Sequence, residues 1–129
     1  MIMQVKFVSI PVRDQDRALA FYTEKMGFRI ATDSPMGPGQ RWIELSIPRA
    51  QTGVVLFTAP GQEGWIGGFM NISFQCDDVV ATYHELKAAG VEFVKEPKSV
   101  RALDGVRVRL HHQPQPRSTF SVSSPRSHL

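Results

Sequence analysis

The sequence predicts an α+β fold built from two similar halves, each a strand, a helix and three further strands. An amphipathic helix is indicated between Asp14 and Gly27, where apolar side chains recur at helical spacing. The same unit returns between Asp77 and Gly90 at an offset of 63, with the same 13-residue separation of acidic residue and glycine. Apolar, β-branched segments flank both helices. Such a repeat indicates two copies of one structural unit.

The first half is expected to span residues 3–60. Met3–Val12 is typical of a strand that ends near Pro11. Asp14 and Asp16 are the candidate helix N-caps, because a short carboxylate can accept from the unpaired first amides. Gly27 then supplies the left-handed residue that ends the helix. The remaining strands are predicted at Phe28–Thr32, Arg41–Ile47 and Gly53–Ala59, with a Pro- and Gly-rich loop at Ser34–Gly39.

The third strand has the clearest alternation. Trp42, Glu44 and Ser46 fall on one face, and Ile43, Leu45 and Ile47 fall on the other.

The second half is expected to span residues 69–123, after a glycine-rich joint at 61–68. Phe69–Gln75 and Val91–Lys95 are its first two predicted strands, and Thr119–Val122 is its last. The interval 101–118 leaves two alternatives open. Val106, Val108 and Leu110 alternate with arginines, which favours a further strand; the sudden excess of Arg, His and Pro is also typical of translation through a shifted frame.

Composition predicts one ordinary domain. The chain has 129 residues, 42% of them hydrophobic and 21% charged, which suits a globular protein with a single core. No apolar run approaches the roughly 20 residues of a membrane span, and the N-terminus lacks a signal-peptide pattern, so we expect a cytoplasmic protein without membrane contact. Cys76 stands alone, which excludes an internal disulfide and favours a buried structural thiol.

The net charge of +3 is unevenly distributed. Residues 1–96 carry nine Lys and Arg against eleven Asp and Glu, whereas residues 97–129 carry six against one. The basic C-terminal arginines have no interleaved aromatic residues and match no nucleic-acid-binding motif. We therefore expect no nucleic-acid partner.

Three segments resemble the vicinal oxygen chelate superfamily of glyoxalases, bleomycin-resistance proteins and extradiol dioxygenases. They are IPVRD at 10–14, the Ala-x-x-Phe-Tyr-x-x-x-x-Gly-Phe pattern from Ala18 to Phe28, and ISFQCDDVVATYHELKAAGVEF at 72–93. The resemblance implies two tandem βαβββ modules forming a curved eight-stranded sheet around a cavity, as in dihydroxybiphenyl dioxygenase, and a homodimer. Residues 101–118 depart from it, because the family's Asp-Pro-x-Gly-Asn-x-Phe segment is missing.

The resemblance also implies where a metal would bind. Metal-using members hold one divalent ion with side chains on the first, fourth, fifth and eighth strands. Matching the motifs places Phe7, Leu56, Asn71 and Ser121 at those positions. Phenylalanine and leucine have no atom that can coordinate a metal, so we expect no metal cofactor at this place. His84, His111, His112 and His128 are expected to be solvated or structural.

The function predicted from these observations is binding of a small organic molecule in a metal-free cavity. Two alternatives remain: a metal-dependent lyase or dioxygenase with atypical ligands, and a non-catalytic structural paralogue. No phosphate loop or nucleophile elbow is present, so catalytic residues are not assigned. The candidate ligand-binding residues combine apolar area with a few polar groups; they are Phe7, Ser9, Trp42, Glu44, Leu56, Thr58, Trp65, Asn71 and Ser73.

Overall fold

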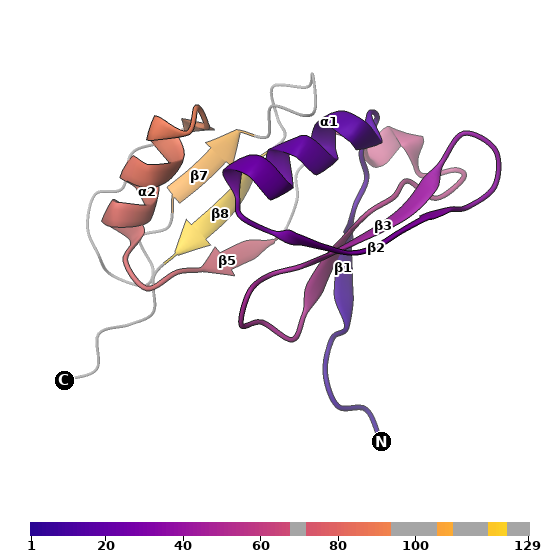
Figure 1. Cartoon of the computed structure of the whole chain (residues 1–129), viewed down its shortest axis with the longest axis horizontal. Helices are drawn as coiled ribbons and strands as arrows, with labels where there is room; N and C mark the ends of the chain where they lie inside the picture. The colour runs from indigo at the N-terminus through magenta and orange to yellow at the C-terminus, as the bar shows by residue number, and fades with distance from the viewer. Residues whose placement is uncertain (68–71, 94–105, 110–118, 124–129) are drawn as a thin grey trace. The chain divides into compact units, whose positions relative to one another are not determined.

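The computed structural model of the chain describes residues 1–67, 72–93, 106–109 and 119–123 (Figure 1). The chain forms two compact units, Met1–Gly67 and Gly68–Leu129. Each has the predicted order of one strand, a helix and three strands. Within the described ranges, every helix is too short or too polar to cross a bilayer.

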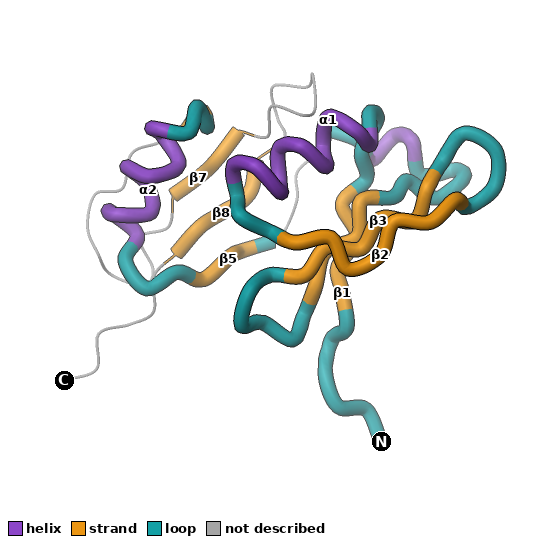
Figure 2. The backbone as a smooth tube through the Cα atoms, in the orientation of Figure 1, coloured by secondary structure: helices purple, strands orange, loops and turns teal. Residues whose placement is uncertain are grey.

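The first unit is a four-stranded sheet of β1 (Phe7–Ile10), β2 (Arg29–Pro35), β3 (Arg41–Ser46) and β4 (Gly53–Leu56). Its order is β1-β4-β3-β2, with β1 parallel to β4 and the other pairs antiparallel. Figure 2 shows β1, β2 and β3 of this sheet in orange. The apolar strand β4 therefore has neighbours on both sides.

The first helix begins where the sequence indicates. Asp14 is the N-cap, and its carboxylate accepts from the backbone N–H of Arg17 at 3.1 Å. Helix α1 (Gln15–Ala20) continues as a π-helical segment, η1 (Phe21–Lys25), and Gly27 follows with a φ of 76°. The helix lies across the β1–β4 sheet (Figure 1). Its buried side chains, Ala18, Phe21 and Tyr22, belong to the core of this unit.

The sheet contributes a fully buried set of side chains to the same core. Ile43 pairs with Leu56 and Leu45 with Val54, so these four share one face, and each is at most 1% exposed. Tyr22 stacks on Phe28 at 5.7 Å between ring centroids. Complete burial raises the pKa of Tyr22, so its phenol stays neutral. Burial of such side chains is the main stabilising contribution to this unit.

Three polar side chains extend the hydrogen bonding where the strands end. The Thr58 hydroxyl accepts from Val12 N at 2.9 Å and donates to Val12 O at 2.8 Å. The Gln40 amide donates to Thr58 O and accepts from Thr58 N, at 3.0 and 2.8 Å. The Gln15 amide makes the same reciprocal pair with the backbone of Arg41, at 2.6 and 2.9 Å. We call these three side chains the polar latch; they satisfy backbone groups that the sheet leaves unpaired.

The second unit repeats the topology of the first. Its helix α2 (Val79–Ala88) begins at Asp78, whose carboxylate accepts from Val80 N and Ala81 N, one residue later than the predicted Asp77. The second sheet has the order β5-β8-β7-β6, with β5 parallel to β8, as β1 is to β4. Its strands are β5 (Ser73–Gln75), β6 (Glu92–Phe93), β7 (Val106–Arg109) and β8 (Thr119–Ser123).

A small core lies under α2. Val79 and Tyr83 are 0% and 6% exposed, and Cys76 and Phe93 pack against them. The Tyr83 and Phe93 rings are 4.7 Å apart. The Cys76 thiol is half-buried beside apolar neighbours, so it is less buried than we expected of a structural cysteine.

The predicted strand at Val106–Leu110 corresponds to β7. The rest of the interval 101–118 lies outside the described residues. The shifted-frame alternative concerns the gene, and resequencing that finds no compensating insertion and deletion would remove it.

Gly53 tests how closely β3 and β4 approach. A Cβ at this position would lie 2.6 Å from Leu45 O, a backbone atom in the middle of the sheet. We expect Gly53→Ala to lower the free energy of unfolding by about 1–3 kcal/mol, because overpacking forces backbone to move. Urea denaturation measures this change. Gly64→Ala is the matched control, since nothing lies within 4 Å of its Cβ; equal stability of the two variants would contradict the close approach.

Thr58 tests the polar latch. Thr58→Val removes the hydroxyl and leaves the buried Val12 N–H and C=O without their partner, so we expect a loss of about 1–3 kcal/mol. Thr58→Ser keeps the hydroxyl and should lose only about 1 kcal/mol for the missing methyl group. Chemical denaturation of both variants ranks them. A larger loss for serine than for valine would show that methyl packing, and not hydrogen bonding, is the role of this residue.

Candidate ligand-binding site

The strand register places four of the nine predicted site residues on one face of the first sheet. Ser9 and Glu44 are both paired with Val55, from opposite sides, so these three side chains share a face. Phe7 lies two residues before Ser9 on β1, and Trp42 lies two residues before Glu44 on β3, so their side chains point to the same face. This is the face opposite to Ile43, Leu45 and Leu56.

An aromatic row runs along this face. The Trp42 ring lies 5.6 Å from that of Phe7, at an interplanar angle of 77°, and 5.3 Å from that of Phe57, at 52°. All three rings are half-buried. Ring pairs at such distances attract one another by about 0.5–1.5 kcal/mol beyond area burial. We call Phe7, Ser9, Trp42, Glu44, Val55 and Phe57 the aromatic face.

Two predicted site residues lie on the other face. Leu56 is paired with Ile10 and Ile43 and is completely buried in the core. Thr58 is 8% exposed, and its hydroxyl is used by Val12. The placement of Leu56 and Thr58 beside Phe7 and Trp42 is therefore wrong. Val55 and Phe57 take their places, one residue away along the chain.

The remaining candidates do not belong to the strands of the first sheet or lie outside the described residues. Trp65 belongs to a short 3₁₀ helix, η2 (Glu63–Trp65), and is 69% exposed. Ser73 is exposed on β5 in the second unit, where it pairs with Ser121. Asn71 lies outside the described residues. Whether any of these residues binds a ligand stays a prediction.

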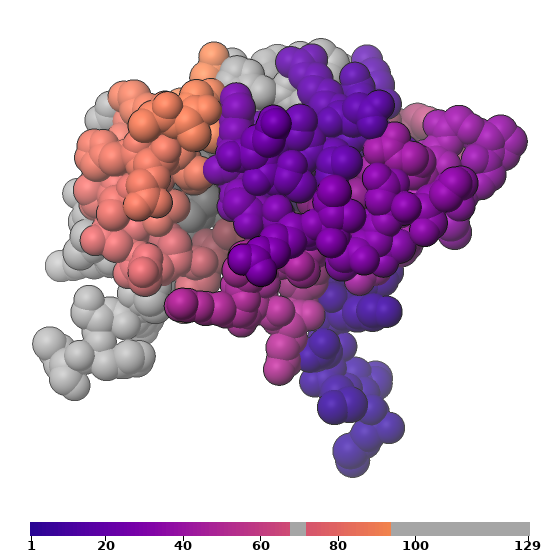
Figure 3. All heavy atoms as spheres, viewed as in Figure 1, coloured from indigo at the N-terminus to yellow at the C-terminus, as the bar shows by residue number. Residues whose placement is uncertain are grey.

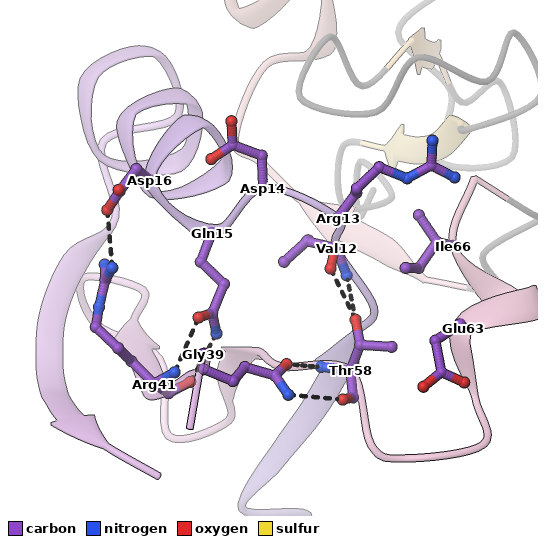
Figure 4. Close-up of a pocket in the computed structure, with 11 residues that line it drawn as sticks. Val12, Arg13, Asp14, Gln15, Asp16, Gly39, Arg41, Thr58, Glu63 and Ile66 are labelled. Carbon is purple, nitrogen blue, oxygen red and sulfur yellow. Dashed lines mark hydrogen bonds and ion pairs between the residues drawn. The ribbon is translucent and has the colours of Figure 1, made fainter. Parts of the chain in front are cut away.

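A pocket of about 650 Å³ lies elsewhere in the first unit, between the start of α1 and the loops that follow β2 and β4 (Figure 4). Sequence reasoning missed it, although the charged run RDQD at 13–16 between a strand and a helix was a usable signal. Its lining is mostly polar: Val12, Arg13, Asp14, Gln15, Asp16, Gly39, Gln40, Arg41, Thr58, Glu63 and Ile66.

Most polar groups of this pocket already have partners. Gln15, Gln40 and Thr58 form the polar latch. Arg41 is held by Asp33 and Asp16, each at 2.9 Å, and these hydrogen bonds raise the pKa of its guanidinium further. Figure 4 shows Asp16 and Arg41 on one side of the pocket and Glu63 and Ile66 on the other. The pocket is therefore built largely from groups that hold the sheet together.

The aromatic face has the opposite character. It combines apolar rings with a small number of polar groups, the composition that organic ligands usually meet in proteins. Its carboxylate, on Glu44, has no hydrogen bond or ion pair with any described residue. Apart from Val55, which is completely buried, these side chains are therefore available to a ligand in a way that the polar latch is not.

Metal-binding side chains do not gather in the described part of the chain. No group of three or more His, Cys, Asp or Glu side chains is placed there to hold an ion. His84 is exposed on α2, and its ring lies 5.2 Å from that of Tyr83. His111, His112 and His128 lie outside the described residues.

The N-terminal residues extend away from the rest of the first unit (Figure 3). Residues 1–3 extend from the unit, and Met1, Ile2 and Met3 are more than 90% exposed. This segment adds no group to the aromatic face or to the pocket described above.

Comparison with known proteins places this geometry in a family. The family model for the Glyoxalase/Bleomycin resistance protein/Dioxygenase superfamily matches residues 4–109. The chain is 40% identical over 100 residues to YetH, an uncharacterized protein of Bacillus subtilis (strain 168), covering 78% of this chain and 83% of YetH.

Solved structures agree with this result. TnmS3, an antibiotic binding protein from Streptomyces sp. CB03234, has a TM-score of 0.77 and 26% identity, covering 96% of this chain and 97% of its own. A superfamily member from Sphaerobacter thermophilus DSM 20745 has a TM-score of 0.77 and 28% identity, covering 96% and 98%. The two-unit βαβββ order, the aligned length and the matching family model together show that this chain belongs to the Glyoxalase/Bleomycin resistance protein/Dioxygenase superfamily.

Proposed function

We propose that this protein binds a small aromatic organic molecule on the aromatic face, without a metal ion and without changing the ligand. The observation that carries the proposal is the row of three half-buried rings centred on Trp42. The antibiotic-binding function of the structural relative TnmS3 supports it. We also propose that the two sheets join into one curved eight-stranded sheet around a cavity, which is the architecture of the family. The aromatic face would then line this cavity.

The side chains of this face do not fit a divalent metal. Phe7 on β1 and Val55 and Phe57 on and after β4 have no donor atom, whereas divalent ions need several converging imidazole, carboxylate or thiolate ligands. Glu44 is a single carboxylate, and one carboxylate does not complete such a site. The chemistry of the donor set therefore supports binding by contact area and hydrogen bonds.

The enzymatic alternative remains a metal-dependent lyase or dioxygenase with ligands at other positions. A structural paralogue that binds nothing remains the third possibility. The three differ in what they bind: an organic molecule, a metal ion, or neither. Binding measurements therefore separate them before any reaction is known.

Trp42 and Trp65 are the only tryptophans, which makes ligand binding easy to locate. We expect a ligand found by thermal-shift screening of aromatic antibiotics, glutathione adducts and catechols to stabilise the protein, by about 2.7 kcal/mol at a hundred times its dissociation constant. Trp42→Leu should weaken that ligand at least about tenfold, equivalent to about 1.4 kcal/mol, because the central ring of the row is lost.

Trp65→Leu is the matched comparison; because Trp65 belongs to η2, is 69% exposed and is not one of the three rings of the row, we expect it to change the dissociation constant less than Trp42→Leu does. Titration calorimetry measures the dissociation constant of the ligand for both variants. Unchanged affinity in Trp42→Leu, or loss of binding only in Trp65→Leu, would contradict the proposed site. No stabilising ligand in the whole screen would favour the structural paralogue.

Metal content gives an independent test. We expect substoichiometric metal by mass spectrometry on untagged protein, before and after dialysis against Ni, Zn, Mn and Fe(II), because Phe7, Val55 and Phe57 offer no ligands. A stoichiometric ion after dialysis would favour the metal-dependent lyase or dioxygenase alternative over metal-free binding. The homodimer stays a prediction, which light scattering during size-exclusion chromatography measures.

A further inference from the structure

Glu44 occupies an unusual place for a carboxylate. It lies on β3, an inner strand of the first sheet, between Thr32 on β2 and Val55 on β4. Its side chain is half-buried, and it has no hydrogen bond or ion pair with any residue that the structure describes. A carboxylate partly withdrawn from water without a compensating partner is unfavourable, and a cation that pairs with it removes that penalty.

Arg41, the positively charged residue nearest to Glu44 in the sequence, does not pair with it. Arg41 lies on the same strand but at a position of opposite parity, so it projects to the face of the helix. There its guanidinium is held by Asp16 and Asp33, each at 2.9 Å. On the aromatic face, the register neighbours of Glu44 are Thr32 and Val55, neither of which is cationic.

The rings around Glu44 also favour a positive charge. The faces of aromatic rings carry partial negative charge, and tryptophan attracts cations most strongly of the three aromatic side chains. Trp42 is two residues from Glu44 on the same face, with Phe7 and Phe57 at 5.6 and 5.3 Å from its ring. A half-buried carboxylate beside an aromatic row is an arrangement that suits a cation with an aromatic or apolar body.

We propose that the ligand of the aromatic face is an organic cation: a planar aromatic molecule with a protonated amine, guanidinium or quaternary ammonium group that pairs with Glu44. The inference rests on the proposed function and adds the charge of the ligand to it. The aromatic body of the ligand stacks against the row of rings centred on Trp42, and the charged group of the ligand lies toward the middle of β3. Neutral and anionic aromatics of the same shape bind more weakly.

A series of three compounds on one scaffold tests this charge preference. 1-Naphthylmethylammonium, 1-naphthylmethanol and 1-naphthoate share the ring system and differ in charge. With the full chain at neutral pH, we expect titration calorimetry to show at least about tenfold tighter binding of the ammonium than of the alcohol. The carboxylate should bind weakest, because it would face the Glu44 carboxylate.

Glu44→Gln keeps the size of the side chain and removes its charge. In this variant the ammonium and the alcohol should bind within about twofold of each other, because the ammonium has lost its charged partner. Glu63→Gln is the matched control, because it removes one negative charge from an exposed site in the separate pocket. It should keep the wild-type preference, and thermal unfolding of both variants checks that they are folded.

The outcomes separate this inference from the proposed function. Equal binding of the three compounds to the wild type, a preference that survives in Glu44→Gln, or a preference lost only in Glu63→Gln would each overturn the assignment of charge. If the alcohol or carboxylate then binds in a way that Trp42→Leu weakens, the proposed binding function stands without it. Absence of any binding that depends on Trp42 would remove both.

Discussion

The parallel pairing of β1 with β4 is the constraint on which the rest of the first unit depends. It brings Phe7 beside Gly53 and Ser9 beside Val55. Along the chain, β1 and β4 are separated by a helix and two other strands. At one end Gly53 pairs with Phe7 and also allows β3 to approach β4, because Leu45 O on β3 leaves no space for a Cβ. Thr58 completes the pairing beyond the other end through the backbone of Val12. The register between these ends decides which side chains share a face.

The two faces of this sheet use their side chains differently. On the helix side, Ile43, Leu45, Val54 and Leu56 are at most 1% exposed, and polar residues such as Gln15 and Arg41 are matched to partners. Those groups contribute to the stability of the fold, and a ligand would have to compete with them. On the other face, Trp42 and Glu44 remain half-buried, and Glu44 has no partner among the described residues. Availability of this kind distinguishes a surface that can bind from one that supports the fold.

Membership of the superfamily explains the architecture but leaves the chemistry to individual side chains, because one fold can carry many functions. TnmS3 is an antibiotic binding protein, while other members named in the family description are glyoxalases and dioxygenases. In this chain, phenylalanine and valine on β1 and β4 favour contact with an organic body. The carboxylate at Glu44 adds a preference in charge. The argument for binding thus comes from the aromatic face and not from the family name.

The order of elements, a helix start at Asp14 or Asp16 and the two faces of β3 could be predicted from the sequence alone. Those features are local: a cap needs one carboxylate, and alternation along RWIELS assigns each side chain to a face. The segment GVVLF at 53–57 has no such alternation, since every residue in it is small or apolar. Only the tertiary structure could decide that Val55 and Phe57, and not Leu56, join Trp42, because the cross-strand register sets the face of a uniformly apolar strand.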